Sequence, residues 1–131
     1  MANLRWKLIT VVAVLVVFSA VGVYPIVAAR YNITNTVGGA IDKTPAWTTF
    51  TAAFTDNSAL GTVSLRLQQV DKCSNAETTI CTITSNDGGT CDSCSFSSNT
   101  IDFANNFYYI QANITRSSTA ATEALHSVAL N

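Results

Sequence analysis

Four cysteines are the residues of this chain whose type and spacing are best suited to chemistry. Cys91 and Cys94 form a Cys-Asp-Ser-Cys motif, and Cys73 and Cys81 precede it. A redox site of the thioredoxin type needs the first cysteine of such a motif at a helix N-terminus, where its pKa falls. Here the motif lies among Gly and Ser residues. A zinc site would need a second closely spaced ligand pair, which Cys73 and Cys81 do not provide. The four cysteines therefore favour structural disulfides.

The pairing of these cysteines is open at the level of the sequence. Four cysteines allow three connectivities, and an even number is typical of two disulfides in an exported protein. Short local loops favour Cys73–Cys81 and Cys91–Cys94. Bridges that close such short loops would each contribute about 2–3 kcal/mol.

The sequence contains no recognisable set of catalytic residues. His126 is the single histidine, and no GxSxG nucleophile motif accompanies it. No carboxylate pair typical of glycosidases and no glycine-rich phosphate loop before a helix is present. We therefore expect a protein that is not an enzyme and that has no cofactor and no catalytic or structural metal ion.

Three aromatic residues are candidates for a binding surface: Trp47, Phe107 and Tyr109. Successive residues of a strand face opposite ways, so Phe107 and Tyr109 should point away from a core that contains Tyr108. Exposed aromatic rings can stack on sugars or on a partner protein. The alternative is that both faces of the sheet are covered and that these rings are core residues.

Two sequons for N-glycosylation are present, at Asn32 and Asn113. Each is an Asn-Ile-Thr sequence, and each is an acceptor only if the chain leaves the cytoplasm of a host that glycosylates. Asn113 lies in an expected strand.

The stretch from residue 8 to residue 29 contains no charged residue. About 20 apolar residues are needed to cross about 30 Å of hydrocarbon, so this stretch is long enough for a transmembrane helix. Arg5 and Lys7 precede it, and this positive charge predicts an N-terminus inside and a C-terminal part outside the cytoplasm. We expect residues 1–7 as a basic cytoplasmic lead and residues 8–29 as a signal anchor.

A cleaved signal peptide is the main alternative for the same stretch. Small residues before Arg30 and before Val23 fit a cleavage site, although signal peptides have a shorter apolar region of about 7–15 residues. In either case the remainder of the chain lies outside the cytoplasm. It would be tethered to the membrane in the first case and secreted in the second.

The end of the apolar stretch, Pro25-Ile26-Val27-Ala28-Ala29-Arg30-Tyr31, is similar to the N-terminal region of type IV pilins. Members of that family combine a basic leader, a long apolar helix and a β-rich head. The chain lacks the glycine of their leader cut site and the glutamate that they carry early in the helix. This resemblance implies a filament subunit whose apolar helices pack in a shared core.

Alternating apolar and polar residues predict strands in the rest of the chain. Phe50, Ala52 and Phe54 should share one face of the first strand. We expect strands within 47–54, 61–70, 78–84, 96–103, 107–116 and 123–130, and a loop over 85–95. The inward faces should carry Val63, Leu65 and Leu67, with Ser64, Arg66 and Gln68 outward. Tyr108, Ile110, Ala112 and Ile114 should share one face of a strand, as should His126, Val128 and Leu130, and His126 should be half-buried or exposed.

Short strands separated by turn residues predict a mainly β protein with a small antiparallel β-sandwich, either jelly-roll or immunoglobulin-like. We expect a linker over 30–45 and the sandwich over 46–131. The net charge of −1 and the absence of a basic stripe argue against nucleic acid as a partner. The sequence thus predicts a non-catalytic protein of the cell surface or periplasm with a structural, adhesive or ligand-binding role. Its partners would be the membrane through 8–29 and a surface protein or glycan. The alternatives are self-assembly as a filament subunit and a small envelope enzyme.

Overall fold

The computed structural model of the chain describes residues 27–34, 36–37, 40–41, 43–118 and 120–131. These residues form β-strands and no helix, which confirms the mainly β prediction for this part of the chain. The strands are β1 (Val27–Ile33), β2 (Thr36–Val37), β3 (Ala40–Ile41), β4 (Thr49–Asp56), β5 (Gly61–Asp71), β6 (Glu77–Thr84), β7 (Cys91–Ser95), β8 (Asn106–Arg116) and β9 (Glu123–Leu130).

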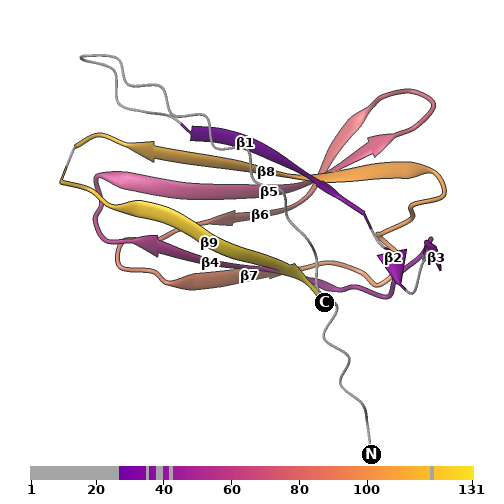
Figure 1. Cartoon of the computed structure of the whole chain (residues 1–131), viewed down its shortest axis with the longest axis horizontal. Coiled ribbons are helices and arrows are strands. Elements are labelled where there is room, and N and C mark those ends of the chain that lie inside the picture. The colour runs from indigo at the N-terminus through magenta and orange to yellow at the C-terminus, as the bar shows by residue number, and fades with distance from the viewer. Residues whose placement is uncertain (1–26, 35, 38–39, 42, 119) are drawn as a thin grey trace, which may run out of the picture.

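Two antiparallel sheets pack face to face as a β-sandwich (Figure 1). One sheet has four strands in the order β1-β8-β5-β6, and the other has three in the order β7-β4-β9. The strands β2 and β3 form a small separate hairpin. Two pairs of consecutive strands, β2–β3 and β5–β6, form hairpins. All other consecutive strands lie in different sheets, so the chain repeatedly crosses the sandwich.

The core lies between the two sheets and is formed by the alternating residues of the strands. Phe50, Ala52 and Phe54 of β4 are buried as predicted, because every second residue of a strand faces the same side. The opposing sheet contributes Val63, Leu65, Leu67, Tyr108, Ile110 and Ala112, all of which are buried. Burial of such side chains is worth roughly 1.5–3 kcal/mol each.

Two β-bulges interrupt the regular pairing of the strands. The register between β5 and β6 shifts between Leu67 and Gln68. The extra residue is Ile80 of β6, whereas β5 keeps a continuous register with β8, so Gln68 faces away from Leu67 as predicted. Gln68 is nevertheless buried, and its side-chain oxygen accepts a hydrogen bond from Thr79 Oγ1 at 2.9 Å. A second register shift lies between β4 and β9, opposite Ala53 and Phe54 of β4, where His126 is the extra residue of β9. It leaves His126 exposed, whereas Val128 packs against the core.

The segment between β6 and β8 differs from the prediction in two places. Cys91–Ser95, expected within a loop, forms β7 and pairs with β4. The expected strand around Ile101 is absent, and residues 97–105 are turns and irregular structure. Ile101 is nevertheless buried, because the segment folds over the end of the core.

The N-terminal strand begins earlier than the sequence predicts. Val27–Ile33 pairs with β8 over its whole length, so residues assigned to the membrane segment and to the linker belong to the sandwich. The rest of the predicted membrane segment, 8–26, lies outside the described residues, as does the basic lead 1–7. Among the residues that the structure does describe, no helix is long and apolar enough to span a membrane.

Candidate functional site

One side of the sandwich is closed by a covalent bond between its two sheets. Cys81 of β6 and Cys94 of β7 form a disulfide, with their Cα atoms 6.2 Å apart. The strand β6 is the edge of the four-stranded sheet, and β7 is the edge of the three-stranded sheet. The bond therefore fixes the two sheets to each other along this edge.

This pairing differs from the one that loop length favours. Cys91 and Cys94 are three residues apart on one strand, so their side chains point to opposite faces of the sheet. Only Cys94 faces the other sheet. Cys91 is an exposed free thiol, and so is Cys73 in the turn between β5 and β6. The spacing of the cysteines could not predict this disulfide, because the prediction requires β7 to be recognised as a strand.

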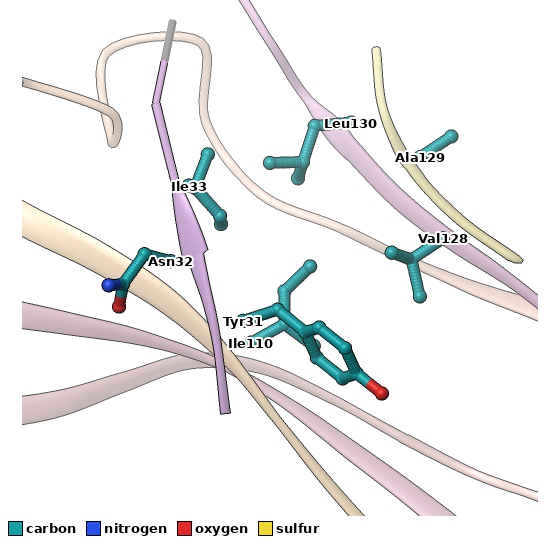
Figure 2. Close-up of a pocket in the computed structure, with 7 residues that line it drawn as sticks. All are labelled: Tyr31, Asn32, Ile33, Ile110, Val128, Ala129 and Leu130. Carbon is teal, nitrogen blue, oxygen red and sulfur yellow. The ribbon is translucent and has the colours of Figure 1, made fainter. Parts of the chain in front are cut away.

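The opposite side of the sandwich is open and apolar. A small pocket between β1 and β9 is lined by Tyr31, Asn32, Ile33, Ile110, Val128, Ala129 and Leu130. Figure 2 shows Ile33 directed toward Leu130 and Asn32 on the other side of β1. The free volume of about 10 Å³ is room for a single water molecule. Small-molecule sites usually measure about 300–1,000 Å³, so this pocket is a seam between strands and not a ligand cavity.

Each strand that borders this seam has one unpaired backbone edge. In the described part of the chain, β1 pairs with β8 alone and β9 pairs with β4 alone. Unpaired N–H and C=O groups along an edge can bind a further strand of another polypeptide. The open side is therefore the candidate functional site, and its chemistry is strand addition next to an apolar seam.

The three aromatic residues proposed as a binding surface have different environments. Trp47 is buried, 8% exposed, and its ring packs edge-on against Phe103 with ring centroids 6.1 Å apart. Tyr109 is 6% exposed and lies under the Arg30 guanidinium, 4.9 Å from its ring centroid. Neither ring is available for stacking on a ligand.

Phe107 is the member of this set that lies on the surface, with 61% of its area exposed. The Lys72 ammonium group sits 4.9 Å from the centroid of its ring. The Lys72 Nζ also donates hydrogen bonds to the carbonyl oxygens of Phe103 and Ala104, at 2.6 and 3.0 Å. Phe107 is thus an exposed aromatic ring with a fixed cation beside it, at the end of the sandwich that carries the β5–β6 turn.

Burial changes the titration of the two tyrosines of β8. It raises the pKa of the Tyr109 hydroxyl, and the nearby Glu77 carboxyl raises that pKa further. It also raises the pKa of the Tyr108 hydroxyl. The Tyr108 hydroxyl accepts a hydrogen bond from the Asp102 backbone N–H at 2.8 Å and donates one to the Thr100 carbonyl at 3.1 Å. Tyr108 therefore holds the irregular segment before β8 in place.

A buried polar pair joins the sheets at the end where β4 finishes. Asp56 is 3% exposed, and its carboxylate accepts a hydrogen bond from Ser85 Oγ. The same Ser85 Oγ accepts one from the Val63 backbone N–H at 2.8 Å. Asp56 belongs to the three-stranded sheet and Val63 to the four-stranded sheet. The pair is therefore a second inter-sheet connection, one that the sequence did not indicate.

His126 and the two sequons lie on the surface of the sandwich. His126 Nε2 is 2.7 Å from Thr55 Oγ1 across the strand pair β4–β9. Within the described residues, no group of three His, Cys, Asp or Glu side chains is arranged for a metal ion. Asn32 is exposed on β1, and Asn113 is half-buried on β8.

Comparison with protein-family models, with curated proteins and with solved structures found no match to this chain.

Proposed function

We propose that this protein is a non-catalytic, exported β-sandwich that acts at the cell surface or in the periplasm in a structural, adhesive or partner-binding role. An N-terminal anchor holds it in the membrane, with the N-terminus inside and the sandwich outside. The disulfide Cys81–Cys94 supports this location, because such bonds persist in oxidising compartments. The anchor must end before β1 begins at Val27. A helix over 8–26 would be about 28 Å long, close to the thickness of the hydrocarbon core.

The observation that carries the proposed binding role is the contrast between the two sides of the sandwich. One side is closed by Cys81–Cys94, and the other presents two free strand edges beside an apolar seam. A partner that adds a strand there gains main-chain hydrogen bonds from the edge and apolar contacts from the seam. The seam is too small for a metabolite, so the partner is a polypeptide.

Within β-sandwiches, the strand order favours the immunoglobulin-like class over the jelly-roll. Seven strands in sheets of four and three, with one hairpin and several crossings between sheets, are typical of that class. An immunoglobulin-like domain places its last strand beside its penultimate one. Here β8 has β1 as that neighbour, and β9 pairs with β4 instead. We propose a variant of the class in which the first and last strands have exchanged sheets.

The two free thiols provide a direct test of the location. Cys73 and Cys91 are both exposed. Intact cells that express the full chain should react with a membrane-impermeant maleimide at these two positions. The variant with Cys73→Ser and Cys91→Ser is the matched control and should remain unlabelled in the same cells. Labelling only after lysis would place the sandwich in the cytoplasm and overturn the proposal.

The intact mass of the native protein separates the anchored form from a secreted one. A full-length chain in the membrane fraction supports the anchor. If a signal peptidase cuts the chain, the two candidate positions have different consequences for the fold. Cleavage before Arg30 would remove part of β1, whereas cleavage before Val23 would leave the strand whole. We therefore expect any processed form to begin at Val23.

A further inference from the structure

We propose that the outer face of the four-stranded sheet binds an acidic polysaccharide, a sugar chain that carries carboxylate or sulfate groups. The strands β1, β8, β5 and β6 form this layer of the sandwich, and their outer face is the side turned away from the core (Figure 1). Strand addition on the open side uses the free edges of β1 and β9. This inference therefore goes beyond the proposed function and concerns a second surface.

Two arginines lie in one row across this face. Arg30 of β1 is opposite Gln111 of β8, and Gln111 is opposite Arg66 of β5. Residues directly opposite each other on neighbouring strands project to the same side of a sheet. On β8 that side is the outer one, because the alternate residues Ile110 and Ala112 are buried in the core. Both arginines are exposed, and two strand spacings separate them, about 10 Å between their Cα atoms.

The charge of this face is positive although the protein as a whole is not. In the described registers of the four strands, the row of the two arginines and the row on either side of it contain no carboxylate. Glu77 follows one row farther on, opposite Val70. The whole chain has a net charge of −1, so the positive charge is a local concentration. Such a surface attracts an anionic ligand.

Arg30 is held in position for contact with an anion. Its guanidinium lies over the ring of Tyr109, 4.9 Å from the ring centroid. That ring is itself 6% exposed, so it forms a fixed platform. A guanidinium stacked in this way keeps the N–H donors in its plane for a carboxylate or sulfate, which it binds with two parallel hydrogen bonds. Because the side chain is already ordered, less entropy is lost when the ligand binds.

The side chains around the arginines are suited to sugar hydroxyls. The amides of Gln111, Asn113 and Asn32 and the hydroxyls of Ser64 and Thr82 lie in the same three rows. Each of these groups both donates and accepts hydrogen bonds, as does each hydroxyl of a sugar. A protein partner would need an apolar centre to its interface, whereas the side chains between the two arginines are polar. The combination therefore favours a sugar chain with acidic groups along its length.

An exposed aromatic ring lies at the end of this face near the β5–β6 turn. Phe107 is the outward residue of β8 before Tyr109, and 61% of its area is exposed. The Lys72 ammonium group covers one side of the ring, 4.9 Å from its centroid. The other side is the place where the apolar face of a sugar ring would stack. The outer face thus combines an aromatic ring with two rows of hydrogen-bonding groups and a row of cations.

Binding assays with the purified full-length protein in detergent test this inference. The protein is made in a host that attaches no N-glycans, because the sequons at Asn32 and Asn113 lie on the same face. The immobilised probes are polygalacturonate, chondroitin sulfate, neutral dextran and polyglutamate. We expect binding to one or both acidic polysaccharides, weakening as the salt concentration rises. Binding to dextran and to polyglutamate should be weaker by about tenfold or more.

Substitutions in the row of arginines locate the site. Arg30→Gln and Arg66→Gln should each weaken binding of the acidic polysaccharide by about tenfold, because each removes charged hydrogen bonds to its acidic groups. Phe107→Ala should weaken it by a smaller factor. Lys43→Gln removes one positive charge outside the four strands and is the matched control, with unchanged binding. Thermal unfolding of each variant checks the fold, and these exposed substitutions should leave the melting temperature close to that of the wild type.

Each of the remaining outcomes overturns the inference. Absence of binding to both acidic polysaccharides, or equal binding to dextran, would show that this face does not recognise an acidic sugar chain. Equal binding to polyglutamate would show that it responds to charge alone. A loss of affinity in Lys43→Gln as large as in the arginine variants would place the site elsewhere. The maleimide experiment is independent of these results, so the proposed location can stand while polysaccharide binding fails.

Discussion

Cys81 and Cys94 connect the edge strands of two different sheets, with their Cα atoms 6.2 Å apart and a sequence separation of 13. The short loop makes this bond look local, but in space it joins the four-stranded sheet to the three-stranded one. It shares this task with the hydrogen bonds of Asp56 and Ser85. The two connections differ in chemistry and can be removed separately.

Removal of the disulfide should lower stability without changing the fold. We expect Cys81→Ser, or reduction of the native protein, to cost about 3 kcal/mol of unfolding free energy, the amount typical of a loop of this length. Denaturant unfolding with and without reductant measures the loss. The free thiols supply the control, since Cys73→Ser with Cys91→Ser should leave the unfolding midpoint unchanged. An unaltered midpoint after reduction would show that the bond does not stabilise the sandwich.

Ser85→Ala should destabilise the protein by about 2–3 kcal/mol, because it leaves the buried Asp56 carboxylate without this donor and the Val63 N–H without its acceptor. Ser95→Ala, at an exposed position of β7, is the matched control and should have little effect. Thermal unfolding of the two variants gives the comparison. Similar melting temperatures for both would contradict the assignment of Asp56 and Ser85 as an inter-sheet connection.

Tyr108→Phe should cost about 1–2 kcal/mol at neutral pH, since the two hydrogen bonds that hold the segment before β8 are lost. Burial raises the pKa of this hydroxyl in the folded state. The stabilisation is therefore complete below the unfolded value near 10.0 and is lost as the pH rises through the folded pKa. The difference between wild type and variant should shrink in alkaline solution. A difference that grows above pH 10 would contradict this sign.

Asp71 should contribute to stability with the opposite dependence on pH. Its carboxylate accepts hydrogen bonds from the Ser74 backbone and hydroxyl and from the Cys73 backbone, and these lower its pKa from 3.8. The contribution is present above the unfolded pKa and is lost as the pH falls through the folded one. Asp71→Asn should therefore be less stable than wild type at pH 7 and approach it in acid. Asp87→Asn, which removes the same charge in an exposed turn, should match wild type at pH 7.

The alternation of apolar residues was sufficient to predict most of the sandwich. It located the inward faces of β4, β5 and β8, because those strands pack a regular pleat against a continuous core. It failed where the backbone departs from that pleat. The bulge at His126 of β9 separates this exposed side chain from Val128, which packs against the core, and a bulge leaves no clear trace in a single sequence.

The candidate site was the part least accessible to the sequence. At the seam, β1 and β9 come together from opposite ends of the described chain, and no local sequence pattern predicts that contact. The residues of β1 also follow directly on a long apolar stretch, so their strand character was masked by hydrophobicity. The disulfide was unpredictable for a related reason, since Cys94 required β7 to be recognised as a strand in a segment rich in Gly and Ser.

The direction in which β1 runs determines how the sandwich would bear a load. Val27 lies at one end of the strand, and the end at Ile33 shares a pocket with Leu130, next to the C-terminus. Tension between an anchored N-terminus and a partner held at the C-terminus would therefore pull along β1 and not across it. Its hydrogen bonds to β8 run perpendicular to that pull, so they must break together in shear instead of opening one after another. A strand pair that is loaded in shear, such as β1 and β8, resists force far better than its equilibrium stability suggests.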